Sequence, residues 1–557
     1  MIGLIAHESR EKSLIKSETE LNFPIEFQTL VEIRDEFHFK SVIMSFFPRI
    51  SCLHGSLELR SKENCVMADQ QMLKFVNLDR EMPLKRDAED RSQDFKEIYA
   101  EYAQEKAKEQ ASRCSQCGVP YCHTHCPLHN NIPDWLMLTA EGRLEEAYNV
   151  SQATNTFPEI CGRICPQDRL CEGNCVIESA GHGTVTIGAI EKYITDTAWD
   201  EGWVKTIKPA TELSYSVGII GAGSGGLAAA DMLRRHGVQV TVYDRYDRAG
   251  GLLTYGIPGF KLEKDIVMRR NEQLTESGVV LKLNCDVGRD ISFADLRAQH
   301  DAVIIATGVY KIRDLDLAGS SRAGVVQALD FLTASNKVNF GDDVPEFDSG
   351  VLNASGKKVV VIGGGDTAMD CVRTAIRQGA SSVKCMYRRD RQNMPGSQRE
   401  VQNAEEEGVV FDWLSAPKGF VGKGSTGTLE DVKSANDPVT GVAAYRMRLG
   451  APDATGRRVP EAIEGSDYVE EADLVIKALG FEPEDLPTLF GEPDLPVTRW
   501  GTVKAEYQTG KTAMDGVYAV GDIVRGASLV VWAIRDGRDT AEAILEEMRA
   551  KTSIAAE

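Results

Sequence analysis

Cysteine is unevenly distributed along this sequence of 557 residues, because eight of its 13 cysteines lie between residues 114 and 175. They form two runs, Cys114-x2-Cys117-x4-Cys122-x3-Cys126 and Cys161-x3-Cys165-x5-Cys171-x3-Cys175. A proline directly follows Cys126 and Cys165, as it does in ferredoxin-type cluster sequences. Thiolates at such spacings bind iron–sulfur clusters, so we expect two clusters here. The x4 gap differs from the bacterial ferredoxin spacing and indicates a related arrangement, not a simple ferredoxin insert.

Zinc is the main alternative occupant of these cysteines. Four-cysteine sites bind zinc tightly, and His123, His125 and His129 are further candidate ligands. Zinc modules usually contain two C-x2-C pairs, however, and this stretch contains one. Zinc also cannot change its oxidation state, so it would make the domain a scaffold instead of an electron carrier. We favour iron–sulfur clusters and keep a zinc-stabilised scaffold as the alternative.

A glycine-rich turn after an apolar strand predicts a first dinucleotide site. Gly221, Gly223 and Gly226 have G-x-G-x-x-G spacing after the predicted strand 217–220. The first glycine permits a tight turn, the second lets a pyrophosphate approach the backbone, and the third allows close packing of helix on strand. Asp244 ends the next predicted strand, where a carboxylate suits the ribose hydroxyls of an adenosine.

A second unit of the same kind begins near residue 357. Gly363 and Gly365 follow the predicted strand 359–362, with an alanine at the third position of the motif. Asp366 and Thr367 begin the predicted helix, whose first N–H groups can bind phosphate. The pattern therefore predicts a second dinucleotide site.

Arginines replace the acid at the end of the second strand of this unit. Arg388 and Arg389 follow the predicted strand 382–387, and Arg391 lies close behind. Guanidinium groups can clamp a 2′-phosphate that a carboxylate would repel, so the unit favours NADP(H) over NAD(H). A solvated basic loop is the alternative interpretation.

A third motif lies near the C-terminus. Gly521 and Asp522 follow a predicted strand and precede a helix that begins near Val530. This resembles the Gly-Asp signature of two-dinucleotide flavoproteins, whose aspartate bonds the flavin ribityl chain. Ala-Thr-Gly at 306–308 and Ala-Leu-Gly at 478–480 match the crossover points of that architecture. The resemblance implies FAD in the first unit and NADPH in the second.

Strands that alternate with helices indicate parallel sheets covered on both faces. We predict an α/β fold in which two Rossmann-like dinucleotide-binding domains, an FAD domain with an inserted NADP domain, follow a helical iron–sulfur domain. Residues 95–113 are rich in helix formers and predict a helix leading into the cysteines. The predicted boundaries are 1–66 for an atypical N-terminal extension, 67–212 for the domain with two 4Fe–4S clusters, 213–350 for the first part of the FAD domain, 351–480 for the NADP(H) domain, and 481–557 for the second part of the FAD domain.

The extension at 1–66 lacks a clear periodicity of apolar residues, whereas the sequence from Met67 onward resembles the natural start of a protein. We interpret the extension as the product of a misplaced initiation codon, with a weakly ordered N-terminal arm as the alternative.

Together with GGLLTYGIPGFKL at 250–262, these motifs occur in one order that resembles the small (beta) subunit of bacterial NADPH-dependent glutamate synthase. The N-terminal half of dihydropyrimidine dehydrogenase is also similar. The resemblance covers residues 70–545 and implies that NADPH reduces FAD, and that the clusters pass single electrons to a large (alpha) subunit making glutamate from glutamine and 2-oxoglutarate. A stand-alone or differently partnered NADPH oxidoreductase, acting on ferredoxin, a pyrimidine or polysulfide, is the alternative.

The same resemblance implies a ligand set for each cluster. Cys114, Cys117, Cys122 and Cys175 would bind one cluster, and Cys126, Cys165, Cys171 and Glu191 the other. Glu191 stands where the dehydrogenase has a glutamine ligand, and Cys161 would be a spare thiol. Leu252 and Lys261 match flavin-contacting positions of the relatives.

The composition excludes some partners. The formal net charge is −21, from 63 Lys+Arg and 84 Asp+Glu, so a nucleic-acid backbone would be repelled. No segment approaches the roughly 20 apolar residues that cross a bilayer. Charged residues soon after Met1 make a poor secretory signal, and clustered thiols suit a reducing compartment, so we expect a cytoplasmic protein with no membrane partner.

Overall fold

The structure is a computed structural model that describes residues 72–423, 437–452 and 458–556. The chain divides into two units, Met1–Asn64 and Cys65–Glu557, and the described residues all belong to the second. The predicted extension at 1–66 therefore lies outside the described residues.

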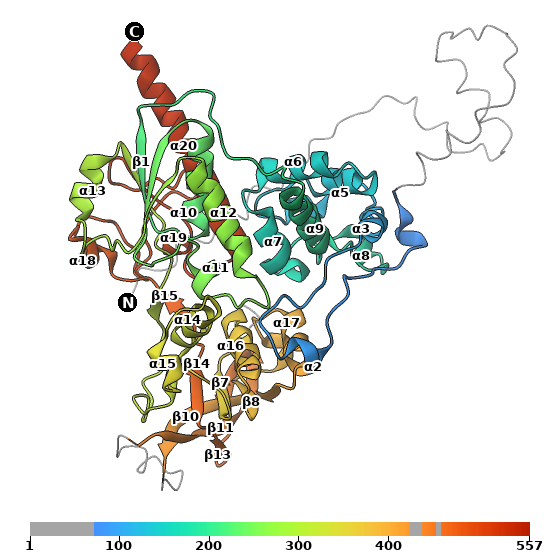
Figure 1. Ribbon diagram of the computed structural model, residues 1–557. Helices are drawn as coiled ribbons and strands as arrows, with labels where there is room; N and C mark the ends of the chain where they lie inside the picture. Colours follow the sequence, from blue (N-terminus) through green and yellow to red (C-terminus); the bar gives the residue numbers. More distant parts are fainter. Residues whose placement is uncertain (1–71, 424–436, 453–457, 557) are drawn as a thin grey trace, which may run out of the picture. The chain divides into compact units, whose positions relative to one another are not determined.

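Short helices build the region that contains the clustered cysteines (Figure 1). Helices α5, α6, α7 and α9 pack on one another around a core that includes Trp135, Tyr148 and Ile190. The helices of this region are η4 (Lys74–Val76), α2 (Ala88–Arg91), α3 (Gln104–Ala111), α4 (Tyr121–Thr124), α5 (Ile132–Ala140), α6 (Leu144–Thr154), α7 (Pro158–Ile164), η5 (Gln167–Arg169), α8 (Val176–Ser179) and α9 (Ile187–Asp200).

The helix predicted over 95–113 is confirmed only for its second half, α3. Residues 98–100 instead pair with an earlier extended segment, through Arg86 N–H to the Ile98 carbonyl and Ala100 N–H to the Leu84 carbonyl, both at 2.9 Å. The helix formers at 95–103 are overridden by this pairing, which satisfies backbone groups that a helix would otherwise satisfy.

The first parallel sheet has the strand order β16-β4-β1-β2-β3. Its strands are β1 (Ser216–Ile220), β2 (Gln239–Tyr243), β3 (Val280–Lys282), β4 (Ala302–Ile305) and β16 (Val517–Ala519). The helices that accompany it are α10 (Ser224–Arg235), α11 (Leu252–Tyr255), α12 (Lys264–Glu276), α13 (Phe293–Gln299), α18 (Leu486–Phe490), α19 (Asp522–Arg525) and α20 (Val530–Ala556). Because β16 pairs with β4, the C-terminal segment completes the sheet that the first glycine-rich turn begins.

The second parallel sheet has the order β6-β14-β7-β8-β9. Its strands are β6 (Val325–Gln327), β7 (Lys358–Ile362), β8 (Ser382–Tyr387), β9 (Val410–Trp413) and β14 (Leu474–Lys477), and its helices are α14 (Ala328–Asn339), α15 (Pro345–Asp348), α16 (Asp366–Arg377), η6 (Arg391–Asn393) and α17 (Gln398–Glu406). Between β9 and β14 the chain adds four antiparallel strands, β10 (Ser415–Gly422), β11 (Val439–Pro452), β12 (Arg458–Ala462) and β13 (Tyr468–Glu471).

The chain crosses between the two sheets at a small antiparallel pair, β5 (Lys311–Ile312) and β15 (Phe481–Glu482). Strand β6 and helix α14 follow β5 and fall inside 213–350, the range predicted for the FAD domain, yet β6 pairs with β14 of the second sheet. The outgoing crossover therefore lies before residue 325, whereas the return at β15 lies close to the predicted boundary at 480/481.

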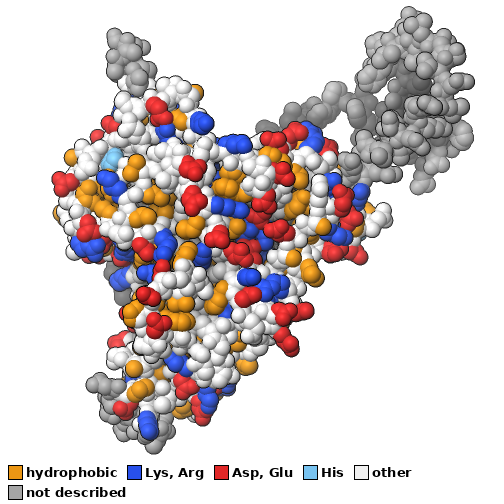
Figure 2. Space-filling view, in the orientation of Figure 1, with side chains coloured by type: hydrophobic (Ala, Val, Ile, Leu, Met, Phe, Trp, Pro, Cys, Tyr) orange, Lys and Arg blue, Asp and Glu red, His pale blue; other side chains and the backbone are white. Residues whose placement is uncertain are grey.

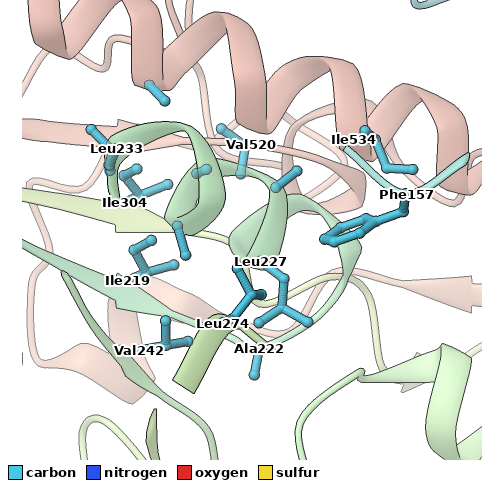
Figure 3. Close-up of a cluster of buried hydrophobic side chains, with 14 of the residues drawn as sticks. Phe157, Ile219, Ala222, Leu227, Leu233, Val242, Leu274, Ile304, Val520 and Ile534 are labelled. Atoms are coloured by element: carbon cyan, nitrogen blue, oxygen red, sulfur yellow. The ribbon is translucent and has the colours of Figure 1, made fainter. Parts of the chain in front are cut away.

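One core joins the cysteine-rich helices to the first sheet. Figure 3 shows Phe157, the residue directly before α7, beside Leu227 of α10 and Ile534 of α20. Cys161 and Cys165 belong to the same buried cluster of side chains. Small residues let α10 and α20 approach closely, since a Cβ on Gly537 would lie 2.2 Å from the Gly225 carbonyl oxygen. Close packing of this kind fixes α20 against both regions.

Candidate flavin, nicotinamide and iron–sulfur sites

The first glycine-rich turn leaves no room for side chains at two of its glycines and keeps the third open to a ligand. Gly221 has a φ of 107°, and a Cβ there would lie 2.4 Å from the Ala306 carbonyl oxygen of the Ala-Thr-Gly motif. A Cβ on Gly226 would lie 2.1 Å from the Gly221 carbonyl oxygen. Gly223, by contrast, faces open space, as a position approached by a pyrophosphate must.

A cleft of about 430 Å³ opens at this turn, with a lining suited to a dinucleotide. It lies at the carboxyl ends of β1 and β4, where the strand order reverses. The predicted residues that line it are Gly221, Gly223, Asp244, Leu252, Gly521 and Asp522. Burial raises the pKa of Asp522 to about 7, although the Ser528 N–H and the charge of Arg525 oppose the rise.

Asp244 is held by the backbone around it. Its carboxylate accepts hydrogen bonds from the N–H groups of Ala222 at 2.6 Å and Tyr246 at 2.8 Å. Burial raises the pKa of this carboxyl group, while those two hydrogen bonds oppose the rise. The remaining lone pairs face the cleft, where ribose hydroxyl groups can donate to them.

The cleft also contains residues that the sequence analysis did not identify. Arg245 binds Glu484 through two hydrogen bonds of 2.9 and 3.0 Å, and its guanidinium lies 4.9 Å from the ring centroid of Tyr310. These residues come from three separate segments that all line the cleft. Arg245 directly follows Asp244, which is the one signal that could have pointed to it.

The second turn repeats the geometry of the first. Gly363 has a φ of 151°, and a Cβ there would lie 2.2 Å from the Ala478 carbonyl oxygen of the Ala-Leu-Gly motif. Gly365 faces open space directly before α16. Asp366 and Thr367 are the first residues of this 12-residue helix, at the end that favours phosphate groups.

The three arginines after β8 differ in their contacts. Within the described residues, neither Arg388 nor Arg389 has an ion-pair partner, and the buried Nε of Arg389 has no hydrogen-bond partner. Arg391 instead pairs with Glu405 at 2.7 Å and contacts Gln398. The first two arginines are therefore available to a phosphate group, whereas the third is engaged within its own domain.

Lys261 does not line the flavin cleft. Its ammonium group is buried, 2.9 Å from Asp370 of α16 and 4.0 Å from Glu400 of α17. It therefore joins the first sheet's domain to the second, and its predicted contact with the flavin stays a prediction.

The cysteines of the first predicted ligand group lie near one another, since their charges affect one another's pKa values. Burial, followed by the nearby charges of Cys175 and Cys117, raises the pKa of Cys114 to about 11. Burial and the charges of Cys114 and Cys175 raise the pKa of Cys122 to about 12. Thiolates this close together in a buried site need positive charge beside them, and iron supplies it.

The second predicted group surrounds a small cavity. Cys126, Cys165, Cys171 and Glu191 all line it, and Cys161 lies there too. Burial and the charge of Glu191 raise the pKa of Cys126 to about 12. The donor set of thiols and one carboxylate fits a 4Fe–4S cluster with a non-cysteine fourth ligand.

Two amides orient Glu191, whose side chain is only 8% exposed. Asn130 and Asn155 each donate a hydrogen bond of 3.1 Å to its Oε1 atom, and neither was expected from the sequence. Asn155 also accepts a weak hydrogen bond from the Cys161 thiol, at 3.7 Å. Both amides bind Oε1, so Oε2 is the atom through which Glu191 would act as a ligand, a role that stays a prediction.

Among the described residues, no three His, Cys, Asp or Glu side chains converge closely enough to hold a single metal ion.

Helix α20 separates the flavin cleft from the second cysteine cavity by a single turn. Val530 and Ala533 line the cleft, and Val531 between them lines the cavity. Arg535 of the same helix donates to the carbonyl of Pro127, next to Cys126, at 3.0 Å. The two sites are therefore neighbours on opposite sides of one helical turn.

The surface of the described part carries no extended region of one charge on the face seen in Figure 2, where acidic and basic side chains are interspersed. Within the described residues, no helix is both long and apolar enough to span a membrane.

Two family models match the chain. The family described as dihydropyrimidine dehydrogenase domain II, 4Fe-4S cluster, matches residues 91–203, and the pyridine nucleotide-disulphide oxidoreductase family matches residues 215–537. Among solved structures, Mycobacterium tuberculosis FprA in complex with NADPH superimposes with a TM-score of 0.50 at 20% identity, covering 62% of this chain and 86% of that one. These matches confirm the predicted fold class and the cofactor classes FAD, NADPH and 4Fe–4S.

Similarity to curated relatives extends over nearly their whole length. The chain is 65% identical over 485 residues to the glutamate synthase [NADPH] small chain of Azospirillum brasilense, covering 87% of this chain and 98% of the relative. It is 45% identical over 481 residues to the corresponding small chain of Escherichia coli K12, covering 86% and 98%. The chain therefore belongs to the family of glutamate synthase [NADPH] small chains.

Proposed function

We propose that this protein is the NADPH-oxidising, electron-input subunit of a glutamate synthase. It takes electrons from NADPH and delivers them to a large subunit, which makes L-glutamate from L-glutamine and 2-oxoglutarate. The proposal rests on identity to small chains over 98% of their length. We place the reaction in the cytoplasm, where thiol ligands stay reduced.

The observation that carries the electron-transfer role is the position of α20. When bound, FAD accepts a hydride and gives up single electrons, which the 4Fe–4S clusters carry. The protein's contribution is to hold these groups close together and apart from water. One helical turn, from Val530 to Ala533, contributes lining to the flavin cleft and to the second cysteine cavity.

The cysteine groups continue the path beyond that turn. In the proposed ligand sets, Cys126 and Cys171 belong to the second cluster and Cys122 to the first. The charges of Cys126 and Cys122 are among those that raise the pKa of Cys171, after desolvation and Glu172, so both lie near it. We therefore assign the second cluster as the electron acceptor next to the flavin, with the first cluster following it.

Reconstitution with the partner tests this function. The chain is purified without air, and its FAD, iron and acid-labile sulfide are measured before NADPH oxidation is followed with ferricyanide. We expect ferricyanide reduction by the chain alone, and glutamate formation only after a large glutamate synthase subunit is added. The large subunit with NADPH, but without this chain, is the control. Full ferricyanide reduction without glutamate after mixing would instead favour the differently partnered NADPH oxidoreductase.

A further inference from the structure

The segment between two predicted ligands of the second cluster contacts the NADPH turn of the other domain. This segment, η5 (Gln167–Arg169), lies between Cys165 and Cys171. Arg169 donates to the Pro395 carbonyl at 2.8 Å and lies 3.5 Å from Asp366. In the opposite direction, Arg399 of the second domain donates a hydrogen bond to the side-chain oxygen of Gln167 at 2.5 Å. Two arginines thus join the cluster region to the loop 394–397 and to the first turn of α17, which follows it.

That loop is itself fixed on the dinucleotide turn. Gly396 N–H donates to the Gly364 carbonyl at 3.0 Å, and Ser397 N–H donates to Asp366 Oδ1 at 2.9 Å. The hydroxyl group of Ser397 is buried beside the turn and has no hydrogen-bond partner. A polar atom left unpaired in such a position indicates that a ligand group completes the site.

Asp366 presents an electrostatic problem at this position. As the first residue of α16, it suits the positive end of the helix, but it stands where the pyrophosphate of NADPH approaches. Two negative groups this close repel each other unless a cation stands between them or draws one aside. Within the described residues, Arg169 is the ion-pair partner of Asp366.

We propose that Arg169, supplied by the iron–sulfur domain, is a positioning residue of the NADPH site. It pairs with Asp366 and holds that carboxylate away from the pyrophosphate, so that the phosphate-binding end of α16 is completed by a residue of another domain. This inference rests on the NADPH site of the proposed function and does not involve the large subunit.

The expected effect is moderate because both side chains are partly exposed, at 45% for Arg169 and 41% for Asp366. An ion pair this accessible corresponds to about a fivefold change in affinity. Arg169→Ala should therefore weaken NADP⁺ binding about fivefold at low ionic strength, and the difference should shrink at high salt. NAD⁺ should be weakened by the same factor, because the two nucleotides share the pyrophosphate.

The test is an equilibrium titration of the anaerobically purified, FAD- and cluster-containing protein with NADP⁺, followed through the flavin absorption. The variants are Arg169→Ala, Asp366→Asn and the double variant. Asparagine keeps the acceptor for Ser397 N–H but removes the charge. Arg143→Ala is the matched control, since Arg143 pairs with Glu141 and Glu146 of its own domain. FAD and iron contents identify any variant that has not folded.

We expect weaker NADP⁺ binding in Arg169→Ala and recovery of wild-type affinity in the double variant. Unchanged affinity in Arg169→Ala would overturn the proposal, and so would weakened binding that the double variant fails to restore. Absence of NADP⁺ binding by the unaltered protein would instead count against the proposed function, so the two failures are distinguishable.

Discussion

Replacing Arg388 and Arg389 together by alanine should change the nucleotide preference of the protein. Both follow β8 at the edge where the adenosine end of a dinucleotide lies. Within the described residues, neither is held in an ion pair, and the Arg389 Nε atom is buried without a partner. A 2′-phosphate would satisfy these groups, and NAD⁺ has no such phosphate.

The size of the effect follows from the exposure of the two side chains. A hydrogen bond to a charged group contributes about 1.5–3 kcal/mol when it is well enclosed. Arg388 is exposed and Arg389 half-buried, so we take less than the full value for the first. Together they should contribute about 3 kcal/mol, which corresponds to a loss of about 100-fold in the preference for NADP⁺ over NAD⁺.

Titration of the FAD-containing protein with NADP⁺ and NAD⁺ measures this preference directly. Arg391→Ala is the matched control, because Arg391 is already paired with Glu405, and its loss should leave the preference unchanged. The reasoning is refuted if the double variant weakens NADP⁺ and NAD⁺ equally. Equal weakening is the behaviour expected of Arg169→Ala, so the two experiments distinguish contacts at the 2′-phosphate from those at the pyrophosphate.

Three further predictions concern the cluster cavity, a buried lysine and a buried carboxylate. Cys126→Ala should lower the iron and sulfide contents while FAD stays bound. Cys161→Ala, in the same cavity, should leave the iron, sulfide and FAD contents unchanged. Iron loss in Cys161→Ala alone would reverse the ligand assignment. Burial lowers the pKa of Lys264 to about 7 from 10.5. The unfolded state therefore binds more protons between these pH values, and the free energy of unfolding should rise by about 2 kcal/mol from pH 7 to pH 9 in denaturant titrations. Lys264→Met should remove that rise. If the variant and the unaltered protein showed the same pH dependence of the free energy of unfolding, Lys264 would not be its cause. Glu407→Gln should destabilise the protein by about 3–5 kcal/mol, because it removes the buried charge that Arg91, Arg373 and Arg377 share and leaves Arg377 without an ion-pair partner among the described residues. Glu405→Gln, at an exposed pair, should cost no more than about 0.5 kcal/mol, and equal losses of thermal stability would refute the argument.

Local backbone chemistry explains why the dinucleotide sites were predictable. A Cβ on Gly221 would lie 2.4 Å from the carbonyl oxygen of Ala306, directly after β4, so the turn excludes other residue types. The same holds for Gly363 and the Ala478 carbonyl oxygen. Constraints of this kind act within a few residues and appear directly in the spacing of glycines. The arginines that follow β8 are also a signal within a few residues of the turn. The preference for NADP(H) was therefore predictable from the sequence as a hypothesis.

The helix predicted over 95–113 shows where such local reasoning fails. Its first half has helix-forming residues, but pairing with residues 84–86 satisfies the backbone in an extended form. Strand β6 likewise lies in a stretch assigned to one domain and pairs in the sheet of the other. Partners distant in sequence decided both cases, and no spacing within the segment records them.

The amino-acid sequence by itself determined the two dinucleotide turns, the grouping of cysteines into one region and the class of cofactors, because each depends on residues close together in the chain. Only the tertiary structure decided that Cys161 lies with Glu191 in one cavity, that Lys261 pairs with Asp370, and that Arg169 reaches the NADPH turn. These contacts depend on how the domains pack. Burial and charge pairing across domains select them after the local elements have formed, so they leave no periodic signal in the sequence.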